Sequence, residues 1–265
     1  MDGVVTRVDT DVTDPMFEVA FYEVKDVTGR RSTPLTSAVN MVSCHGDSRR
    51  ATEEEFETVD DSGRRATRER PYFDWGYVCP TNEAYRTELL ELIDACVAIA
   101  PDVRLDDVGF ARAEYCRCAR CETLVAESSA TDRWDWRETV VTDFLEEATD
   151  RIDGRSYLTV YPDPYPNHLS RRSGINLEAA AELVDEIVVP LYDLAYETTY
   201  WIEAIASAFA DRVTDASLGI ELYGIDIDLE NLVNATEVAD AYASSVYIAY
   251  DADTARAVAK RRDTV

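Results

Sequence analysis

Carboxylate side chains follow one predicted strand after another along this chain of 265 residues. The predicted strand Val103–Leu105 runs directly into Asp106 and Asp107. Four later strands end in the same way, at Asp163, at Asp193, at Asp226 and Asp228, and at Asp251. Parallel strands that form a barrel share one rim at their carboxyl ends, where barrel enzymes place their catalytic residues. Carboxyl groups crowded at one rim differ in pKa, so one can donate a proton while another stays ionised.

The elements that would position these carboxylates alternate regularly. From Val103 to Tyr250, five predicted strands are separated by predicted helices, which favours right-handed β–α–β units and a parallel sheet. Three earlier predicted strands raise the total to the eight of an α/β fold of the (β/α)8 TIM-barrel type; they are Phe17–Val24, Ala38–Cys44 and Phe73–Val78. An open, doubly wound sheet is the alternative, although no glycine-rich phosphate-binding loop follows any of the strands.

The first quarter of the predicted barrel lacks the expected helices. We expect one barrel domain over 1–265, with an irregular, hairpin-containing part at 16–80 and regular β–α units at 81–262. The stretches D-V-T-G-R-R-S-T (26–33) and D-D-S-G-R-R-A-T (60–67) are nearly the same, and each predicts a tight hairpin turn around its glycine. Either these hairpins replace the missing helices, or the first barrel strands are missing or rearranged.

The strongly acidic composition limits which partners the protein could bind. The chain carries 53 acidic and 26 basic residues, a net charge of −27, and only Lys25 and Lys260 among the basic residues are lysines. This composition is typical of proteins that work in strong salt, which screens self-repulsion. It argues against nucleic acid and anionic membranes as partners. No signal peptide or membrane span is visible, so we expect a cytoplasmic protein, of undetermined oligomeric state.

Several residues near the predicted rim have the chemistry of a sugar-binding cleft. Arg104 lies two residues before Asp106 on one strand, hence on the same side, where its charge would keep Asp106 ionised. Tyrosines suit the apolar faces of sugars, and carboxylates suit their hydroxyl groups. The candidate binding residues at or just past strand ends are Tyr161, Tyr192, Tyr196, Tyr223, Asp226 and His45.

Three of the six cysteines form a C-x-C-x-x-C cluster at Cys116, Cys118 and Cys121. With Cys79 as a fourth ligand they would make a closed structural zinc site. The pair Cys44–His45 offers another fourth ligand, and reduced thiols or a disulfide within the loop are the alternatives without a metal.

Three motifs together resemble those of uncharacterised glycoside-hydrolase-like barrel proteins. They are C-P-T-N-E-A-Y-R-T-E-L-L (79–90), V-R-L-D-D-V-G-F (103–110) and C-R-C-A-R-C (116–121). The segments Y-P-D-P-Y, V-V-P-L-Y-D and L-Y-G-I-D-I-D resemble haloarchaeal members of the same set, so the resemblance covers about residues 17–251. It implies a barrel that acts on carbohydrates, with no cofactor needed for catalysis.

The resemblance also implies candidate catalytic residues. Arg104-x-Asp106 resembles the fourth-strand R-x-D of the α-amylase superfamily, in which the aspartate is the nucleophile. The α-galactosidase-like clan pairs such an aspartate with one that ends the sixth strand, which here is Asp193. Asp107, Asp163 and Glu221 are further candidates, with Glu221 either the acid or a buried ion-pair partner. We therefore predict glycosidic-bond hydrolysis by two carboxylates; a non-catalytic carbohydrate-binding barrel and a metal-dependent hydrolase are the alternatives.

Overall fold

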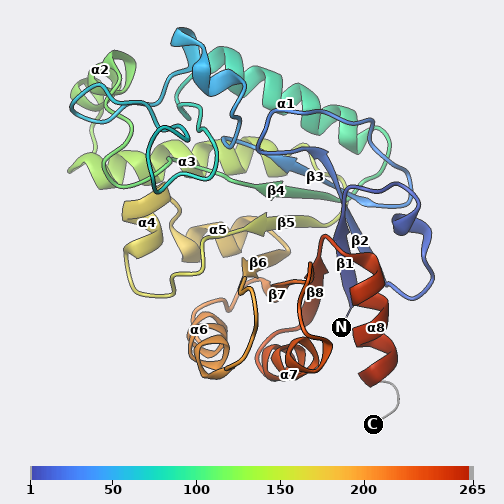
Figure 1. Ribbon diagram of the computed structural model, residues 1–265. Coiled ribbons are helices and arrows are strands. Elements are labelled where there is room, and N and C mark those ends of the chain that lie inside the picture. Colours follow the sequence, from blue (N-terminus) through green and yellow to red (C-terminus); the bar gives the residue numbers. More distant parts are fainter. Residues whose placement is uncertain (1, 263–265) are drawn as a thin grey trace.

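The computed structural model describes residues 2–262 and contains a closed barrel of eight parallel strands (Figure 1). The strands are β1 (Gly3–Thr6), β2 (Val19–Lys25), β3 (Val39–Ser43), β4 (Val103–Asp106), β5 (Ser156–Thr159), β6 (Glu186–Pro190), β7 (Ser217–Tyr223) and β8 (Ser245–Ala249). Each strand pairs with its neighbours in chain order, and β1 pairs with β8 to close the barrel. The prediction of a (β/α)8 barrel is therefore confirmed, and the open sheet is excluded.

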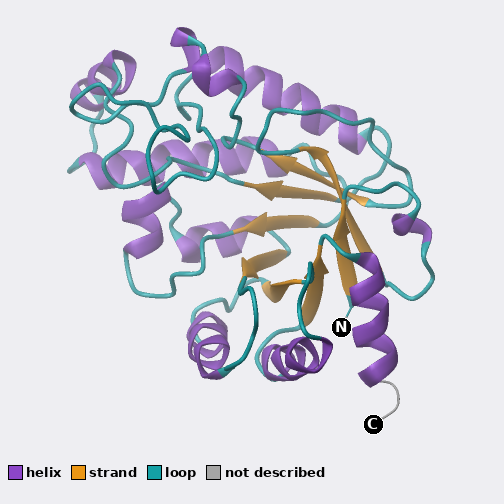
Figure 2. Cartoon of the chain, viewed as in Figure 1, coloured by secondary structure: helices purple, strands orange, loops and turns teal. Residues whose placement is uncertain are grey.

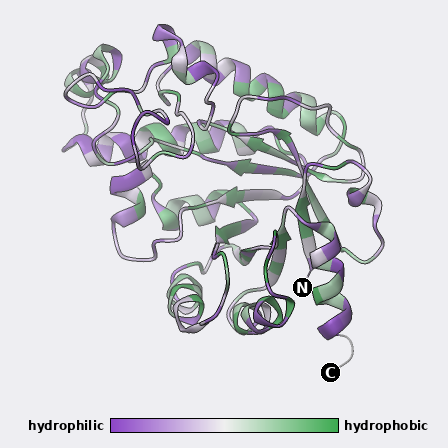
Figure 3. Ribbon diagram, in the orientation of Figure 1, coloured by the Kyte–Doolittle hydropathy of each residue, from purple (hydrophilic) through white to green (hydrophobic). Residues whose placement is uncertain are grey.

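Helices surround this barrel and present their apolar sides to it (Figures 2 and 3). They are α1 (Glu83–Val97), α2 (Ala119–Glu127), α3 (Arg133–Thr149), α4 (His168–Ser173), α5 (Leu177–Leu183), α6 (Tyr200–Ala210), α7 (Leu229–Asp240) and α8 (Ala252–Arg262). Asn82 caps α1, because its side chain accepts a hydrogen bond from the Tyr85 N–H. Within residues 2–262, every helix is too short or too polar to cross a bilayer.

One predicted strand is wrong. Phe73–Val78 forms no barrel strand and makes a single bridge, between Tyr77 and Gly46. The eighth strand is instead β1, which lies close to the start of the chain and places Gly3 beside Val19 of β2. Aromatic residues in 73–78 resemble a strand in composition, but several of them pack into a loop instead.

The first quarter of the barrel closes without the usual helices. The link from β1 to β2 carries the short 3-10 helix η1 (Asp11–Thr13), and the one from β2 to β3 carries a hairpin turn. The long link from β3 to β4 carries η2 (Arg50–Thr52), η3 (Glu54–Phe56), a second hairpin turn and then α1. Both predicted turns are present, with φ of +85° at Gly29 and +74° at Gly63, values that favour glycine.

The middle of the barrel interior is apolar, with the buried Glu186 of β6 bonded to the Tyr247 hydroxyl toward the amino ends of the strands and charged residues toward the carboxyl ends. Phe21 packs edge-on against Tyr157 and Tyr247, with ring centroids 5.1 and 4.8 Å apart. Because side chains alternate between the two faces of a strand, Glu23 follows Phe21 on the inner face of β2. The charged layer formed in this way lies toward the carboxyl ends of the strands, where the candidate site is found.

Candidate functional site

A cavity of about 530 Å³ opens at the carboxyl ends of the strands. Its floor is charged, with Arg7, Glu23, Arg104, Asp106, Asp107 and Glu221 among the lining residues. Its walls come largely from three segments, one before α1, one between β4 and α2 and one between β5 and α5. The first two lie together over this end of the barrel (Figure 1). The cavity therefore brings residues far apart in the sequence around four carboxylates of the floor, Glu23, Asp106, Asp107 and Glu221, with a fifth, Asp74, in the wall.

Two of these four carboxylates are held by ion pairs. Arg104 on β4 lies with Nη1 2.5 Å from Oε2 of Glu221 on β7, and both side chains are buried. Glu221 also accepts a hydrogen bond from the Tyr192 hydroxyl. Glu23 is held in the same manner, by the guanidinium of Arg7 and by the Tyr250 hydroxyl. These contacts fix both glutamates as stationary negative charges beneath the cavity.

Asp106 and Asp107 differ from the glutamates, because no ion pair with either is found within residues 2–262. Asp106 ends β4, and Asp107 follows with a φ of +50° that turns the chain. The Ser43 hydroxyl donates to Oδ2 of Asp107 at 2.7 Å, and the Asp107 N–H donates to Oδ1 of Asp106 at 2.9 Å. Both carboxyl groups remain partly accessible and face the cavity.

The surroundings raise the pKa of both groups, to different extents. Burial raises the pKa of Asp106, while the Arg104 charge opposes that rise. Burial raises the pKa of Asp107 to about 8, and the neighbouring charge of Asp106 adds to the rise. At neutral pH Asp107 therefore keeps its proton, beside a second carboxyl group, Asp106, whose ionised form the Arg104 charge favours. An acid next to a base is the arrangement that general acid–base catalysis requires.

Aromatic side chains form much of the cavity wall. Tyr72 and Trp75 come from the segment before α1, and Tyr161 follows β5. The guanidinium of Arg172 lies over the Tyr161 ring at 3.5 Å from its centroid, and that of Arg112 lies over the Tyr72 ring at 4.7 Å. Rings and guanidinium groups together offer stacking surfaces beside hydrogen-bond donors.

The structure brings six of the sequence-derived candidates to this cavity: Asp106, Asp107, Glu221, Arg104, Tyr161 and Tyr192. It does not bring Asp193 or Asp163 there. Asp193 turns back to accept the N–H groups of Leu194 and Ala195, while Asp163 contacts His168 at 2.9 Å. Both carboxylates are thus engaged within their own loops, so the pairing of Asp106 with Asp193 has no geometric support.

The remaining candidates also lie away from the lining. His45 is buried, accepts the Gly109 N–H at Nδ1 and packs edge-on against Phe144; burial lowers its pKa to about 3. Tyr196 is buried too, with its hydroxyl between the Leu191 carbonyl and the Tyr223 N–H. Tyr223 packs on Tyr192, and Asp226 is exposed in the turn after β7. These residues support the rim rather than line the cavity.

Sequence reasoning missed several lining residues, among them Glu23, Arg7, Tyr250, Tyr72 and Trp75. A signal for Glu23 was present, because an acidic residue on the Phe21 face of β2 must point into the barrel. Arg7 was missed together with β1. Trp75 gave no signal because it lies in Phe73–Val78, which is predicted as a barrel strand, and Tyr72 directly precedes that segment.

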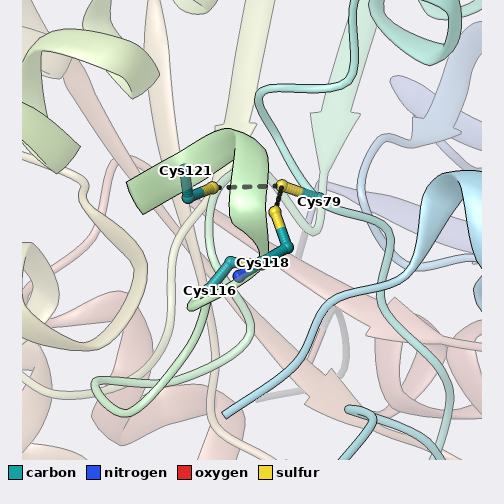
Figure 4. Close-up of side chains that lie close together, drawn as sticks. All are labelled: Cys79, Cys116, Cys118 and Cys121. Carbon is teal, nitrogen blue, oxygen red and sulfur yellow. Dashed lines mark hydrogen bonds between the residues drawn. The ribbon is translucent and has the colours of Figure 1, made fainter. Parts of the chain in front are cut away.

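The four cysteines Cys79, Cys116, Cys118 and Cys121 form a second cluster (Figure 4). Their sulfur atoms all lie within 4.8 Å of one another, and all six cysteines of the chain are free thiols. Cys79 comes from the segment before α1, and the other three come from the start of α2 and the loop before it. Cys44 and His45 do not belong to this group, which could bind a metal ion.

Comparisons with known proteins show the fold. No family model matches the chain, and no curated protein does. The glycoside hydrolase domain of PgaB (BpsB) from Bordetella bronchiseptica is similar in structure, with a TM-score of 0.69 and 13% identity over 97% of this chain and 96% of that one. A β-galactosidase from the psychrophilic Marinomonas ef1 has a TM-score of 0.60 and 9% identity over 99% of this chain. The match spans 59% of that β-galactosidase. The chain thus has the barrel fold of glycoside hydrolase domains.

Proposed function

We propose that this protein hydrolyses a glycosidic bond in the cavity at the carboxyl ends of its barrel strands. The observation that carries the proposal is the pair Asp106–Asp107, in which both carboxyl groups face the cavity and burial raises the pKa of Asp107 to about 8, while Arg104 opposes the rise in the pKa of Asp106. The names of both structural neighbours, a glycoside hydrolase domain and a β-galactosidase, agree with this reaction class.

In the proposed reaction, Asp107 is the acid and Asp106 is the anion. Asp107 donates its proton to the glycosidic oxygen as the bond from that oxygen to the anomeric carbon breaks. Asp106 stabilises the positive charge that develops on the sugar ring, or bonds to it, before water completes the hydrolysis. The products are a free reducing sugar and the released alcohol, and the second proton of the water restores Asp107.

The fixed glutamates and the aromatic walls serve binding in this proposal. Glu23 and Glu221 are held in place by arginines, so they would accept hydrogen bonds from sugar hydroxyl groups without moving. Tyr72, Trp75 and Tyr161 would stack on the apolar faces of sugar rings. The ligand is therefore a carbohydrate, of a size that a cavity of about 530 Å³ accepts.

Substrates with good and poor leaving groups distinguish the proposed role of Asp107 as the acid from that of Asp106 as the anion. A panel of 4-nitrophenyl glycosides and the matching methyl glycosides supplies good and poor leaving groups on the same sugars. Asp106→Asn should abolish hydrolysis of both kinds. Asp107→Asn should lose the methyl glycosides but keep much of the rate on nitrophenyl glycosides, because nitrophenolate needs no protonation.

The matched comparison is Asp193→Asn, which changes a strand-end carboxylate outside the cavity and should leave the rate within about twofold. An Asp106→Asn variant that folds and hydrolyses at the wild-type rate would contradict the proposal. If the wild-type protein binds an oligosaccharide in calorimetry yet hydrolyses no member of the panel, the barrel is a carbohydrate-binding protein instead.

We assign no catalytic role to the cysteine cluster. Its four sulfurs form a closed set of protein ligands, which is the pattern of structural metal sites, whereas catalytic sites keep a position open for water or substrate. The proposed chemistry uses the carboxyl groups of the chain alone.

A further inference from the structure

We propose that Cys79, Cys116, Cys118 and Cys121 bind one Zn²⁺ ion, which clamps together two of the segments that wall the cavity, the one before α1 and the one between β4 and α2. The metal site stands independently of the proposed hydrolysis. Its effect on the cavity wall deepens that proposal, because the same wall residues would bind the substrate.

The sulfur positions fit a tetrahedral ion. Zn–S bonds of about 2.3 Å place the sulfurs of a regular tetrahedron about 3.8 Å apart. The Cys79 sulfur lies 3.8 Å from that of Cys118 and 3.4 Å from that of Cys121 (Figure 4). A disulfide would need about 2.05 Å. Four thiols brought this close without bonding to one another are arranged as ligands around a common centre.

The charges around the cluster provide a second, independent observation. Arg137 of α3 is fully buried, and among the described residues no carboxylate pairs with it. Its guanidinium donates to three carbonyl oxygens, two of which belong to Arg112 and Ala113, four and three residues before Cys116. Buried charges are normally paired. Four thiolates around Zn²⁺ carry a net charge of −2, which would supply the missing counter-charge.

The cluster joins the wall segment before α1 to the one between β4 and α2. Cys79 lies two residues after Tyr77, and Cys116 lies four residues after Arg112; both Tyr77 and Arg112 line the cavity. The two segments also meet directly, because the Phe73 and Tyr115 rings lie 5.5 Å apart. An ion bound to all four sulfurs would therefore hold both segments at a fixed separation.

Arg137 extends this connection to α4. Its guanidinium donates to the carbonyls of Arg112 at 3.1 Å, Ala113 at 3.0 Å and Arg172 at 2.8 Å. The metal centre, Arg137 and the backbone of the wall thus form one connected unit. Loss of the metal would loosen the wall and leave the barrel strands intact.

Metal content and cobalt spectroscopy test the site itself. The full-length protein, purified without chelator, should contain one zinc ion per chain when its metal content is measured by inductively coupled plasma mass spectrometry. Replacement by Co²⁺ should give the visible bands of tetrahedral cobalt and the near-ultraviolet thiolate-to-cobalt bands. Cys118→Ser and Cys121→Ser should lower the zinc content at least tenfold.

Cys96→Ala is the matched control, because Cys96 is a buried thiol of α1 outside the cluster; it should keep one zinc. If a serine variant fails to fold, the thiolate-to-cobalt bands of the wild-type protein still show whether the cysteines bind the metal. Iron in place of zinc, or the absence of thiolate-to-cobalt bands, would overturn the site.

Hydrogen–deuterium exchange tests the clamp without reference to turnover. Removal of zinc with a mercurial and a chelator, followed by reduction, should speed exchange at least tenfold in 72–79 and 108–121. The strands β5 to β8 should stay unchanged. Equal protection of both segments with and without zinc would refute the clamp. A protein that keeps this zinc-dependent protection but hydrolyses no glycoside would refute only the proposed function.

Discussion

Arg104 reaches from β4 to Glu221 on β7, with Nη1 2.5 Å from Oε2, and so connects opposite sides of the barrel. The same guanidinium donates to Thr159 of β5 at 2.9 Å and lies over the Phe21 ring of β2. One buried cation of β4 thus contacts three other strands beneath the proposed catalytic pair. It sets the charge of the cavity floor as well as its shape.

Removing one partner of this buried pair should be costly. Arg104→Met leaves the Glu221 carboxylate buried with only the Tyr192 hydroxyl as a partner, and we expect a loss of about 3–5 kcal/mol in the free energy of unfolding. The double variant Arg104→Met/Glu221→Leu should recover much of that loss, because no uncompensated charge remains. Urea denaturation followed by circular dichroism measures both. A double variant less stable than Arg104→Met would show that the pair is strongly stabilising in itself.

The proton on Asp107 should govern the alkaline side of the rate profile. Because burial raises its pKa to about 8, kcat/KM for a methyl glycoside should fall as the pH rises through about 8. The Ser43 hydroxyl bond favours the ionised carboxylate. Ser43→Ala should therefore raise the pKa of Asp107 and move the fall to higher pH. If kcat/KM of Ser43→Ala falls at the same pH as that of the wild type, a group other than Asp107 causes the fall.

The raised pKa of Asp107 should also lower the stability of the folded protein as the pH rises. The unfolded chain releases the Asp107 proton near pH 4, whereas the folded chain keeps it up to about pH 8. The stability of the wild type should therefore fall relative to Asp107→Asn as the pH rises from 4 to 8. Because the group is partly exposed, we expect a relative change of about 2–4 kcal/mol. Urea denaturation of both proteins at several pH values tests this, and a difference that is constant with pH would contradict the raised pKa.

Much of the barrel could be predicted from the sequence, because its later strands are buried runs that alternate with amphipathic helices. The four residues of β1 escaped prediction, since a strand buried on both sides has no alternation and is too short to stand out. Phe73–Val78 was wrongly predicted as a strand because of its composition. Its aromatic residues have strand composition, yet Phe73 packs against Tyr77 and Tyr115 in the cavity wall.

The candidate site was predictable where strand geometry decides it. Arg104 and Asp106 share the inner face of β4 because they lie two residues apart. Residues after the strand ends depend on turn geometry instead. Asp107 faces the cavity because its φ of +50° turns the chain there, whereas Asp193 bonds to its own turn. Composition does not distinguish these two turns, so the cavity could not have been assembled from strand ends alone.

Salt should stabilise this protein strongly. A net charge of −27 on 265 residues repels itself in the folded state, and at an ionic strength of about 1 M the screening length shrinks to about 3 Å. Raising KCl from about 0.1 M to about 2 M should therefore raise the melting temperature by roughly 5–10 °C, equivalent to about 2–3 kcal/mol.

Two controls separate screening from other effects of concentrated salt. Sucrose of equal osmolality leaves charges unscreened and should produce a smaller rise. The variant Glu54→Gln/Glu55→Gln removes two exposed acidic groups from η3, so its melting temperature should depend less steeply on KCl than that of the wild type. Equal slopes for the two proteins, together with an equal effect of sucrose, would mean that the acidic surface does not set the response to salt.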